Sequence, residues 1–157
     1  MQKTIGFIGC GNIAQAMINS LVKSGKFPVE NIIASNRSLP LLNSTIDELK
    51  IKLTNDNIEV ASRSDYIILA VKPQIYDLVL NEIRDHIKED GIVIGIGAGV
   101  SSSFLKEHLK AATKYLKAMP NTPAMVGEGV TAIAPGDRFT EEELDKITDI
   151  FKAFGRV

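Results

Sequence analysis

The segment Gly9-Cys-Gly-Asn-Ile-Ala14 constrains the fold of this sequence most, because it breaks an apolar run with two glycines and then opens an amphipathic stretch. Residues 3–8 before it are typical of a short strand. After it, apolar side chains recur at helical spacing, and those expected to face inward are Ile13, Met17, Leu21 and Val22. A strand, a glycine turn and a helix in this order predict a dinucleotide-binding turn.

The small residues of this turn have separate expected roles. Gly9 is expected to form the tight turn, Gly11 to let the backbone approach a pyrophosphate, and Ala14 to let the helix lie close to the sheet. Free N–H groups at the start of the helix would bind the anion. The alternative is a strand-to-helix turn that holds no ligand. Cys10 is interpreted as a small filler rather than a nucleophile, because no histidine adjoins it in the sequence.

The rest of the chain alternates between buried-strand patterns and helical patterns. Strands are predicted at 31–35, 51–53, 66–71, 91–95, 114–118 and 130–134. A short polar helix is predicted within 39–48. A longer helix follows Lys72-Pro73, with Ile75, Leu78, Val79, Ile83 and Ile87 on one face. This alternation predicts an α/β fold with a doubly wound, mostly parallel sheet covered on both faces, in one domain over 1–157.

Several signals mark where helices begin and end. Gly25 and Pro28 should close the first helix, and the serines at 101–103 should cap a helix that runs to Leu109. A capping box at 140–143 should open a last helix ending at Gly155, with Leu144, Ile147, Phe151 and Phe154 inward. The apolar face around Phe151 and Phe154 suits either the sheet or a partner. The segment 119–124 contains two prolines, which predicts a shaped loop rather than a helix or central strand.

The end of the second predicted strand, Ala34-Ser-Asn-Arg-Ser38, bears on cofactor choice. NAD sites usually place a carboxylate here for the ribose 2′-hydroxyl, whereas this sequence has Asn36 and Arg37. A guanidinium suits a 2′-phosphate, so NADP is favoured. The alternative is that Arg37 is a solvated loop charge. Lys72 is interpreted as a structural or cofactor-edge residue rather than a catalytic lysine, because no activating partner is visible.

Composition excludes several function classes. With 157 residues, 18 Lys and Arg against 19 Asp and Glu, and a formal charge of −1, the chain has no basic field for nucleic acid or anionic membrane. No run reaches the roughly 18 apolar residues of a membrane helix, so we expect a cytoplasmic protein. One cysteine and two isolated histidines, His86 and His108, make a metal site improbable, and both histidines are expected at the surface of helices.

Four motifs, in chain order, resemble those of pyrroline-5-carboxylate reductases, and the resemblance runs from end to end of the chain. They are Gly6-Phe-Ile-Gly-Cys-Gly-Asn-Ile-Ala14, Ala70-Val-Lys-Pro-Gln74, Gly97-Ala-Gly-Val-Ser101 and Met119-Pro-Asn-Thr-Pro-Ala124. The Pro-Asn-Thr-Pro loop is the most specific of them. The resemblance implies an NAD(P)H-dependent reduction of the cyclic imine L-1-pyrroline-5-carboxylate to L-proline, the last step of proline biosynthesis.

The resemblance also implies a set of contacts, residue by residue. The pyrophosphate would meet Ile8, Gly9, Cys10, Gly11, Asn12 and Ile13, and the adenosine ribose would meet Asn36 and Arg37, with Asn57 near the same end. Ala70, Val71, Lys72 and Pro73 would line the crevice, and Gly97, Ala98 and Gly99 would lie near the nicotinamide. Asn121, Thr122 and Pro123 would shape the nicotinamide and substrate side. No residue of this chain is assigned a catalytic role, because a protonated imine is already an electrophile.

Members of that family continue into a helical domain that resembles a dimerisation unit and completes the substrate pocket. We expect residues 1–157 to be the NADP-binding, Rossmann-type domain, with that second domain absent from this chain. The polypeptide alone is expected to bind NADP(H), with NAD(H) as the other possible cofactor, and to have little or no reductase activity. The full-length protein is expected to be a homo-oligomer. Two other readings stay open: a β-hydroxyacid-dehydrogenase-like NADP enzyme, against which the Pro-Asn-Thr-Pro loop argues, and a non-catalytic NADP-binding or redox-sensing module.

Overall fold

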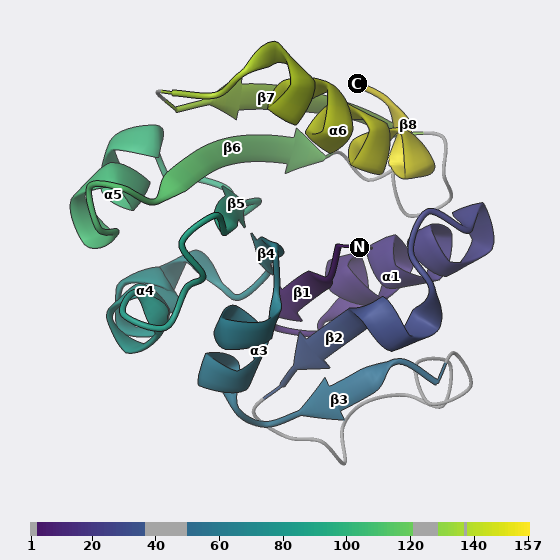
Figure 1. Cartoon of the computed structure of the whole chain (residues 1–157), viewed down its shortest axis with the longest axis horizontal. Helices are drawn as coiled ribbons and strands as arrows, with labels where there is room; N and C mark the ends of the chain where they lie inside the picture. Colours follow the sequence, from purple (N-terminus) through teal and green to yellow (C-terminus); the bar gives the residue numbers. More distant parts are fainter. Residues whose placement is uncertain (1–2, 37–49, 121–128, 137) are drawn as a thin grey trace.

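The computed structural model describes residues 3–36, 50–120, 129–136 and 138–157, which alternate between strands and helices (Figure 1). The strands are β1 (Ile5–Ile8), β2 (Ile32–Ser35), β3 (Lys52–Thr54), β4 (Tyr66–Leu69), β5 (Ile92–Gly95), β6 (Lys114–Pro120), β7 (Gly129–Pro135) and β8 (Gly155–Arg156). The α-helices are α1 (Asn12–Ser24), α3 (Asn57–Arg63), α4 (Tyr76–Ile83), α5 (Ser102–His108) and α6 (Glu141–Phe151). Short 3-10 helices cover Val29–Asn31, Pro73–Ile75 and Lys152–Phe154.

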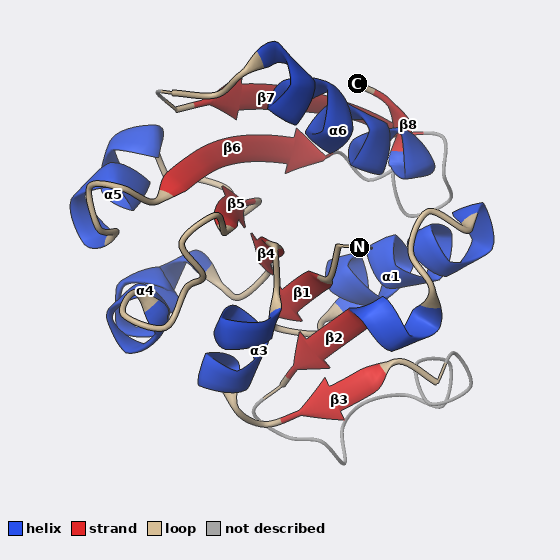
Figure 2. Cartoon of the chain, viewed as in Figure 1, coloured by secondary structure: helices blue, strands red, loops and turns tan. Residues whose placement is uncertain are grey.

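The strands form one sheet in the order β3-β2-β1-β4-β5-β6-β7-β8. Among the described strands every neighbouring pair is parallel except β6 and β7, which are antiparallel. Figure 2 shows the strands as the central layer, with α1 and α6 on one side and α3, α4 and α5 on the other. The order reverses at β1, where the chain moves outward first through β2 and β3 and then through β4. This confirms the predicted doubly wound sheet and puts a ligand crevice at the carboxyl ends of β1 and β4.

Each face of the sheet has its own hydrophobic core, because alternate side chains of a strand point to opposite faces. Phe7 and Ile68 pack with side chains of α1 and α6, including Met17 and Ile147. On the other face, strand residues such as Ile67 and Val93 pack with side chains of α3, α4 and α5. Strands buried on both faces must be apolar throughout, which is why β1, β4 and β5 read as continuous apolar runs.

The predicted caps are confirmed at the end of α1 and at the starts of α5 and α6, whereas the last helix, predicted to end at Gly155, ends at Phe151 and is followed by the 3-10 helix Lys152–Phe154. Gly25 closes α1 in the left-handed conformation, at φ 71°. The Ser101 side chain accepts a hydrogen bond from Phe104 N–H at the start of α5. Thr140 and Glu143 form the full capping box of α6. Phe151 and Phe154, for which the sequence left two partners open, are both fully buried in the core that α1 and α6 share.

Two side chains predicted to face inward lie at the surface instead. Ile13 is 41% exposed, because the inward stripe of α1 begins one residue later, at Ala14. Leu78 is 59% exposed, because α4 turns Tyr76, Val79, Leu80 and Ile83 toward the sheet. The face that contains Leu78 and the face that contains Tyr76 both carry apolar residues at helical spacing. The sequence pattern therefore did not show which of these two faces packs against the sheet.

The prediction that residues 119–124 form a loop is wrong for the first two of them. Met119 and Pro120 extend β6 and pair with Ala132 and Thr131 of β7. The ladder between β5 and β6 ends earlier, at Gly95 and Lys117, so β6 has a neighbour on one side only at Pro120. A proline is tolerated in a strand at such an edge position, where its missing N–H has no ladder bond to make. Residues 121–124 of the motif lie outside the described residues.

The sequence pattern missed α3, which follows the short strand β3. The helix has seven residues, of which only Val60 and Ala61 are buried, so its apolar period is too short to read. Its one clear signal is Asp56, whose carboxylate accepts a hydrogen bond from Ile58 N–H at 2.9 Å and caps the helix. The polar helix predicted within 39–48 lies outside the described residues.

Candidate functional site

The turn after β1 has the backbone that the glycine pattern predicts. Gly9 has φ 94°, and a Cβ built on it would lie 2.9 Å from the carbonyl carbon and oxygen of Ala70. Its N–H donates to the Ser35 carbonyl oxygen at 3.1 Å, which ties the turn to the end of β2. Gly11 differs, because a Cβ there would meet nothing within 4 Å. Gly9 is therefore required by the fold, whereas Gly11 leaves open space in front of the start of α1.

The start of α1 has no side-chain cap among the residues that the structure describes. Its N-cap, Gly11, makes no side-chain cap hydrogen bond, and the first turn contains no acidic residue. The helices α3, α5 and α6 are different, because each is capped by a side chain, from Asp56, Ser101 and Thr140 respectively. An uncapped helix start with free N–H groups and the positive end of the helix dipole is a site for an anion.

A cleft of about 530 Å³ opens in front of this turn, at the carboxyl ends of β1, β2 and β4. It brings together eight of the residues predicted to contact a cofactor: Gly9, Cys10, Gly11, Asn36, Asn57, Ala70, Val71 and Lys72. The other lining residues are Ser35, Asn55, Ile75, Leu78, Val79 and Glu82. The first strand, the second strand and the fourth strand thus contribute to one cavity, as the fold of the sheet requires.

The remaining predicted contacts have other positions. Ile8 is fully buried beneath the turn, and its carbonyl accepts a hydrogen bond from Ala70 N–H at 2.8 Å. Asn12 and Ile13 are exposed in the first turn of α1, and Pro73 is exposed at the start of a 3-10 helix. Gly97, Ala98 and Gly99 follow β5, next to the end of β4, and are not among the residues that line the cleft. Arg37, Asn121, Thr122 and Pro123 lie outside the described residues.

One end of the cleft has a chain of polar contacts that begins at the buried end of β2. The Ser35 hydroxyl donates to Asn57 Oδ1 at 2.6 Å, and Asn57 Nδ2 donates to Glu82 Oε1 at 2.8 Å. The N–H of Asn36 donates to the Thr54 carbonyl at 3.1 Å. These bonds orient the side chain of Asn57, which the motif comparison placed at this end, and they add the carboxylate of Glu82 to the cleft.

Sequence reasoning did not single out Glu82 or Asn55 as site residues. Glu82 follows Leu78 by four positions on α4, and Ile75, Leu78 and Val79 line the same cleft. Residues four apart lie on one helix face, so Leu78 and Glu82 lie on the same face of α4. The signal in the sequence was therefore an apolar residue followed four positions later by a carboxylate. The sequence analysis instead placed Leu78 on the face expected to pack in the core.

Cys10 lines the cleft but has little access to solvent. Its side chain is 3% exposed, and burial raises the pKa of its thiol to about 11. The thiol is therefore protonated at neutral pH. This supports its interpretation as a filler of the turn rather than a nucleophile.

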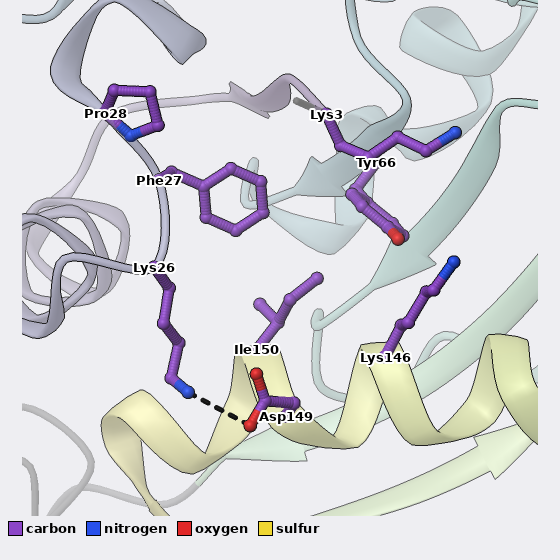
Figure 3. Close-up of a pocket in the computed structure, with 8 residues that line it drawn as sticks. All are labelled: Lys3, Lys26, Phe27, Pro28, Tyr66, Lys146, Asp149 and Ile150. Carbon is purple, nitrogen blue, oxygen red and sulfur yellow. Dashed lines mark ion pairs between the residues drawn. The ribbon is translucent and has the colours of Figure 1, made fainter. Parts of the chain in front are cut away.

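A second cavity, of about 220 Å³, lies at the amino end of β4, away from the glycine turn (Figure 3). It is lined by Phe27, Tyr66 and Ile150, and along one side of it the Lys26 ammonium pairs with Asp149 at 3.1 Å. None of the residues predicted to bind a cofactor lines it. The larger cleft at the carboxyl ends is the candidate site, because the uncapped helix start and the motif residues meet there.

The described residues contain no group of three or more His, Cys, Asp or Glu side chains that could hold a metal ion. His86 is exposed, and the ring of His108 stacks on Phe104 with centroids 4.0 Å apart. Within the described ranges, no helix is long and apolar enough to cross a membrane.

Comparison with known proteins agrees with this geometry. Residues 4–99, which include the glycine turn and the cleft, match the family described as NADP oxidoreductase, coenzyme F420-dependent. The chain is 38% identical over 151 residues to a pyrroline-5-carboxylate reductase of Methanosarcina acetivorans, with 96% of this chain and 56% of that protein covered.

Solved structures give the same picture. A pyrroline-5-carboxylate reductase from Coxiella burnetii superposes with a TM-score of 0.92 at 30% identity, over 100% of this chain and 58% of that chain. Pyrroline carboxylate reductase of Plasmodium falciparum, solved with NADP bound, superposes with a TM-score of 0.88 at 28% identity, over 99% of this chain and 57% of that chain. The chain thus spans little more than half the length of these relatives. Since the family match covers more than half of its residues, the chain belongs to the NADP oxidoreductases of the coenzyme F420-dependent family.

Proposed function

We propose that this chain is the NADP-binding part of a pyrroline-5-carboxylate reductase. The observation that carries the proposal is the similarity over 96% of the chain to a protein of that name, with the glycine turn and its cleft inside the matched region. The proposed reaction consumes L-1-pyrroline-5-carboxylate, NAD(P)H and a proton, and it gives L-proline and NAD(P)⁺. Residues 1–157 would form one cofactor-binding domain of this enzyme, which is expected in the cytoplasm and as a homo-oligomer.

The residues present fit a dinucleotide. Gly11 leaves room in front of α1, where a Cβ would otherwise project into the space that a pyrophosphate needs. The N–H groups of the first turn lack a side-chain partner and would donate to the phosphate oxygens. Leu78 and Ile75 supply an apolar wall in the same cleft, which suits the face of an adenine ring.

The choice of NADP over NAD depends on the end of β2. Neither Ser35 nor Asn36 is a carboxylate, and the side chain of Ser35 is committed to Asn57. In the sequence Arg37 follows directly, and its guanidinium would pair with a 2′-phosphate. Of the described residues that line the cleft, only Glu82 carries a carboxylate, and this carboxylate accepts a hydrogen bond from Asn57 Nδ2.

The bound cofactor would supply the hydride, so the chain mainly has to bind and orient. The glycine turn and the start of α1 would fix the pyrophosphate, and the loop after β5 would approach the nicotinamide end. The protonated imine needs no strong acid–base pair from the protein. Asn121, Thr122 and Pro123 are proposed, from the motif alone, to shape the side where the substrate lies.

The test uses the 157-residue chain, a chimera and a control variant of that chimera. The 157-residue chain should bind NADPH, measured by titration, but should oxidise it slowly with pyrroline-5-carboxylate. A chimera that appends the unmatched segment of the Methanosarcina acetivorans reductase should restore substrate-dependent oxidation. The same chimera carrying Gly11→Val serves as the matched control, and it should lose both binding and turnover.

Each part of the proposal has its own failure. A well-folded chain that binds neither NADPH nor NADH would overturn the cofactor assignment. A chimera that binds NADPH but reduces other substrates, and not pyrroline-5-carboxylate, would overturn the substrate assignment. Fast turnover by the 157-residue chain would contradict the expectation that the substrate pocket needs more than these residues.

A further inference from the structure

The backbone of Gly97, in the loop after β5, is held by two buried side chains from different elements. Its N–H donates to the hydroxyl oxygen of Tyr76 at 2.8 Å, and its carbonyl accepts a hydrogen bond from the Lys117 ammonium. Tyr76 belongs to α4 and is fully buried, and Lys117 belongs to β6 and is 7% exposed. The N–H and the carbonyl of Gly97 are therefore both held by hydrogen bonds to side chains.

These contacts begin where the sheet stops. The ladder between β4 and β5 ends at Leu69 and Gly95, and the ladder between β5 and β6 ends at Gly95 and Lys117. The Tyr76 hydroxyl donates to the Leu69 carbonyl at 2.6 Å while it accepts from Gly97 N–H. Tyr76 therefore links the last residue of β4 to the loop after β5, and Lys117 links β6 to the same loop. Together, these two side chains fix the position of the loop just after the last paired residue of β5.

The packing around Gly97 is closely matched to Tyr76. A Cβ on Gly97 would lie 2.8 Å from Tyr76 Oη and 2.9 Å from Cζ. The ring of Tyr76 is buried in the core of its face of the sheet, so it has no space into which to withdraw. A glycine at 97 and a tyrosine at 76 are thus needed together for this contact.

The position of Lys117 needs a reason beyond packing. A buried ammonium is unfavourable compared with an apolar side chain of similar volume. Its ammonium donates to the backbone carbonyl of Gly97, and none of the ion pairs among the described residues includes it. A functional role for the hydrogen bond from Lys117 to Gly97 would explain why a lysine lies at this buried position.

We propose that Tyr76 and Lys117 are positioning residues that hold the loop 97–99 in the shape that receives the nicotinamide end of the dinucleotide. This rests on the proposed function, because it takes the cleft before α1 as the site of the pyrophosphate. The loop lies at the carboxyl edge of the sheet beside the end of β4, so a dinucleotide that crosses from β2 over β1 reaches it with its far end.

The test compares two ligands on the same variants. NADPH carries the nicotinamide, whereas 2′-phospho-ADP-ribose has the rest of the molecule without that ring. Tyr76→Phe and Lys117→Met should each weaken NADPH about three- to tenfold, as expected for one lost hydrogen bond, and should leave 2′-phospho-ADP-ribose unchanged. Lys117→Arg should retain most of the NADPH affinity, since it keeps a donor. Matched controls are Tyr66→Phe, at the amino end of β4, and Lys114→Met, at the amino end of β6.

A second measurement reads the loop without a cofactor. Amide hydrogen exchange at Gly97 should be faster in Tyr76→Phe than in the wild type, and unchanged in Tyr66→Phe. Equal loss of both ligands, or no loss of either, would overturn the positioning role while leaving the dinucleotide site in place. A wild-type chain that binds neither ligand would overturn the proposed function and the positioning role with it, even with Gly97 exchange slow.

Discussion

The hydroxyl of Ser35 donates to Asn57 Oδ1 at 2.6 Å, and this bond joins the buried end of β2 to the first residue of α3. Ser35 is 1% exposed, so water cannot replace the bond if it is lost. Asn57 uses its other amide atom, Nδ2, to reach Glu82. The orientation of Asn57 in the cleft is therefore set from both sides by residues of two different elements.

Ser35→Ala should destabilise the fold by about 1 kcal/mol, because it leaves Asn57 Oδ1 without its buried donor. It should also weaken NADPH, since Asn57 would lose its fixed orientation. Urea unfolding and an NADPH titration measure the two effects. Ser64→Ala is the matched control, because Ser64 Oγ is buried without a hydrogen-bond partner among the described residues. Equal destabilisation by the two substitutions would contradict the importance of the Ser35–Asn57 bond.

Gly11→Val should abolish binding of both NADPH and NADH while the chain still folds. Gly11 has φ −79°, which any residue adopts, and its Cβ direction is open, so we expect a stability change within about 1 kcal/mol. The valine side chain would occupy the approach to the start of α1. Circular dichroism with thermal unfolding checks the fold, and titration checks the binding.

Gly9→Val provides the contrast within the same turn. Its φ of 94° and the close carbonyl of Ala70 predict a chain that unfolds or misfolds. If Gly11→Val bound NADPH like the wild type, the pyrophosphate would have to lie elsewhere, and the proposed cleft would be wrong.

Arg37→Ala should weaken NADPH and leave NADH nearly unchanged. A charge-assisted bond to the 2′-phosphate contributes about 1–3 kcal/mol, and NADH has no such phosphate. Parallel titrations of the two cofactors against the wild type and the variant give the ratio directly. Arg63→Ala, on the exposed side of α3 where Arg63 pairs with Glu59, controls for the loss of one positive charge. Equal loss of both cofactors on Arg37→Ala would contradict a role at the 2′-phosphate.

Cys10 should react slowly with iodoacetamide at pH 8. Burial raises the pKa of its thiol to about 11, so only about one thiol in a thousand is ionised at that pH. Because the chain has one cysteine, mass spectrometry of the intact protein follows this reaction alone. The urea-unfolded chain is the reference and should react far faster. A folded chain that is alkylated as fast as the unfolded one would contradict the buried, protonated thiol.

The sheet could be predicted from the sequence because its central strands are buried on both faces. Residues 66–69 and 92–95 are continuous apolar runs for this reason, and helical patterns between them imply parallel crossovers. The glycine turn was also predictable, because Gly9 must adopt a backbone that other residues avoid. Both features depend on residues that are close together in the sequence, so the sequence alone was enough to predict them.

Other features depend on which elements the fold brings together. The face of α4 that contains Tyr76 packs against the sheet, so Leu78 and Glu82 on another face line the cleft. Apolar residues on two faces of one helix have the same spacing, so the sequence does not show which face is buried. The contacts of Gly97 with Tyr76 and Lys117 join residues twenty or more positions apart and connect the loop after β5 to α4 and to β6. No motif spacing records such a contact, so it could be found only in the structure.

Lys117→Met should change the pH dependence of stability at alkaline pH. Burial lowers the pKa of Lys117 below its usual 10.5, so the folded chain gives up this proton more readily than the unfolded chain does. Between the lowered pKa and 10.5 the unfolded state therefore binds more protons, and the stability of the wild type rises with pH through that window. Below this pH range, the buried charge of Lys117 lowers the free energy of unfolding by an amount that does not change with pH. The variant with methionine carries no such charge.

Urea unfolding of the wild type and Lys117→Met at a series of pH values measures this difference. The free-energy difference should favour the variant at neutral pH and should shrink as the pH approaches 10.5 from below. Subtracting the two chains cancels the titration of all other lysines. A difference that stays flat, or that grows with pH, would contradict a buried Lys117 whose proton is weakly held. Taken with a loss of NADPH affinity in the same variant, a gain in stability at neutral pH would separate the use of this lysine from its cost to the fold.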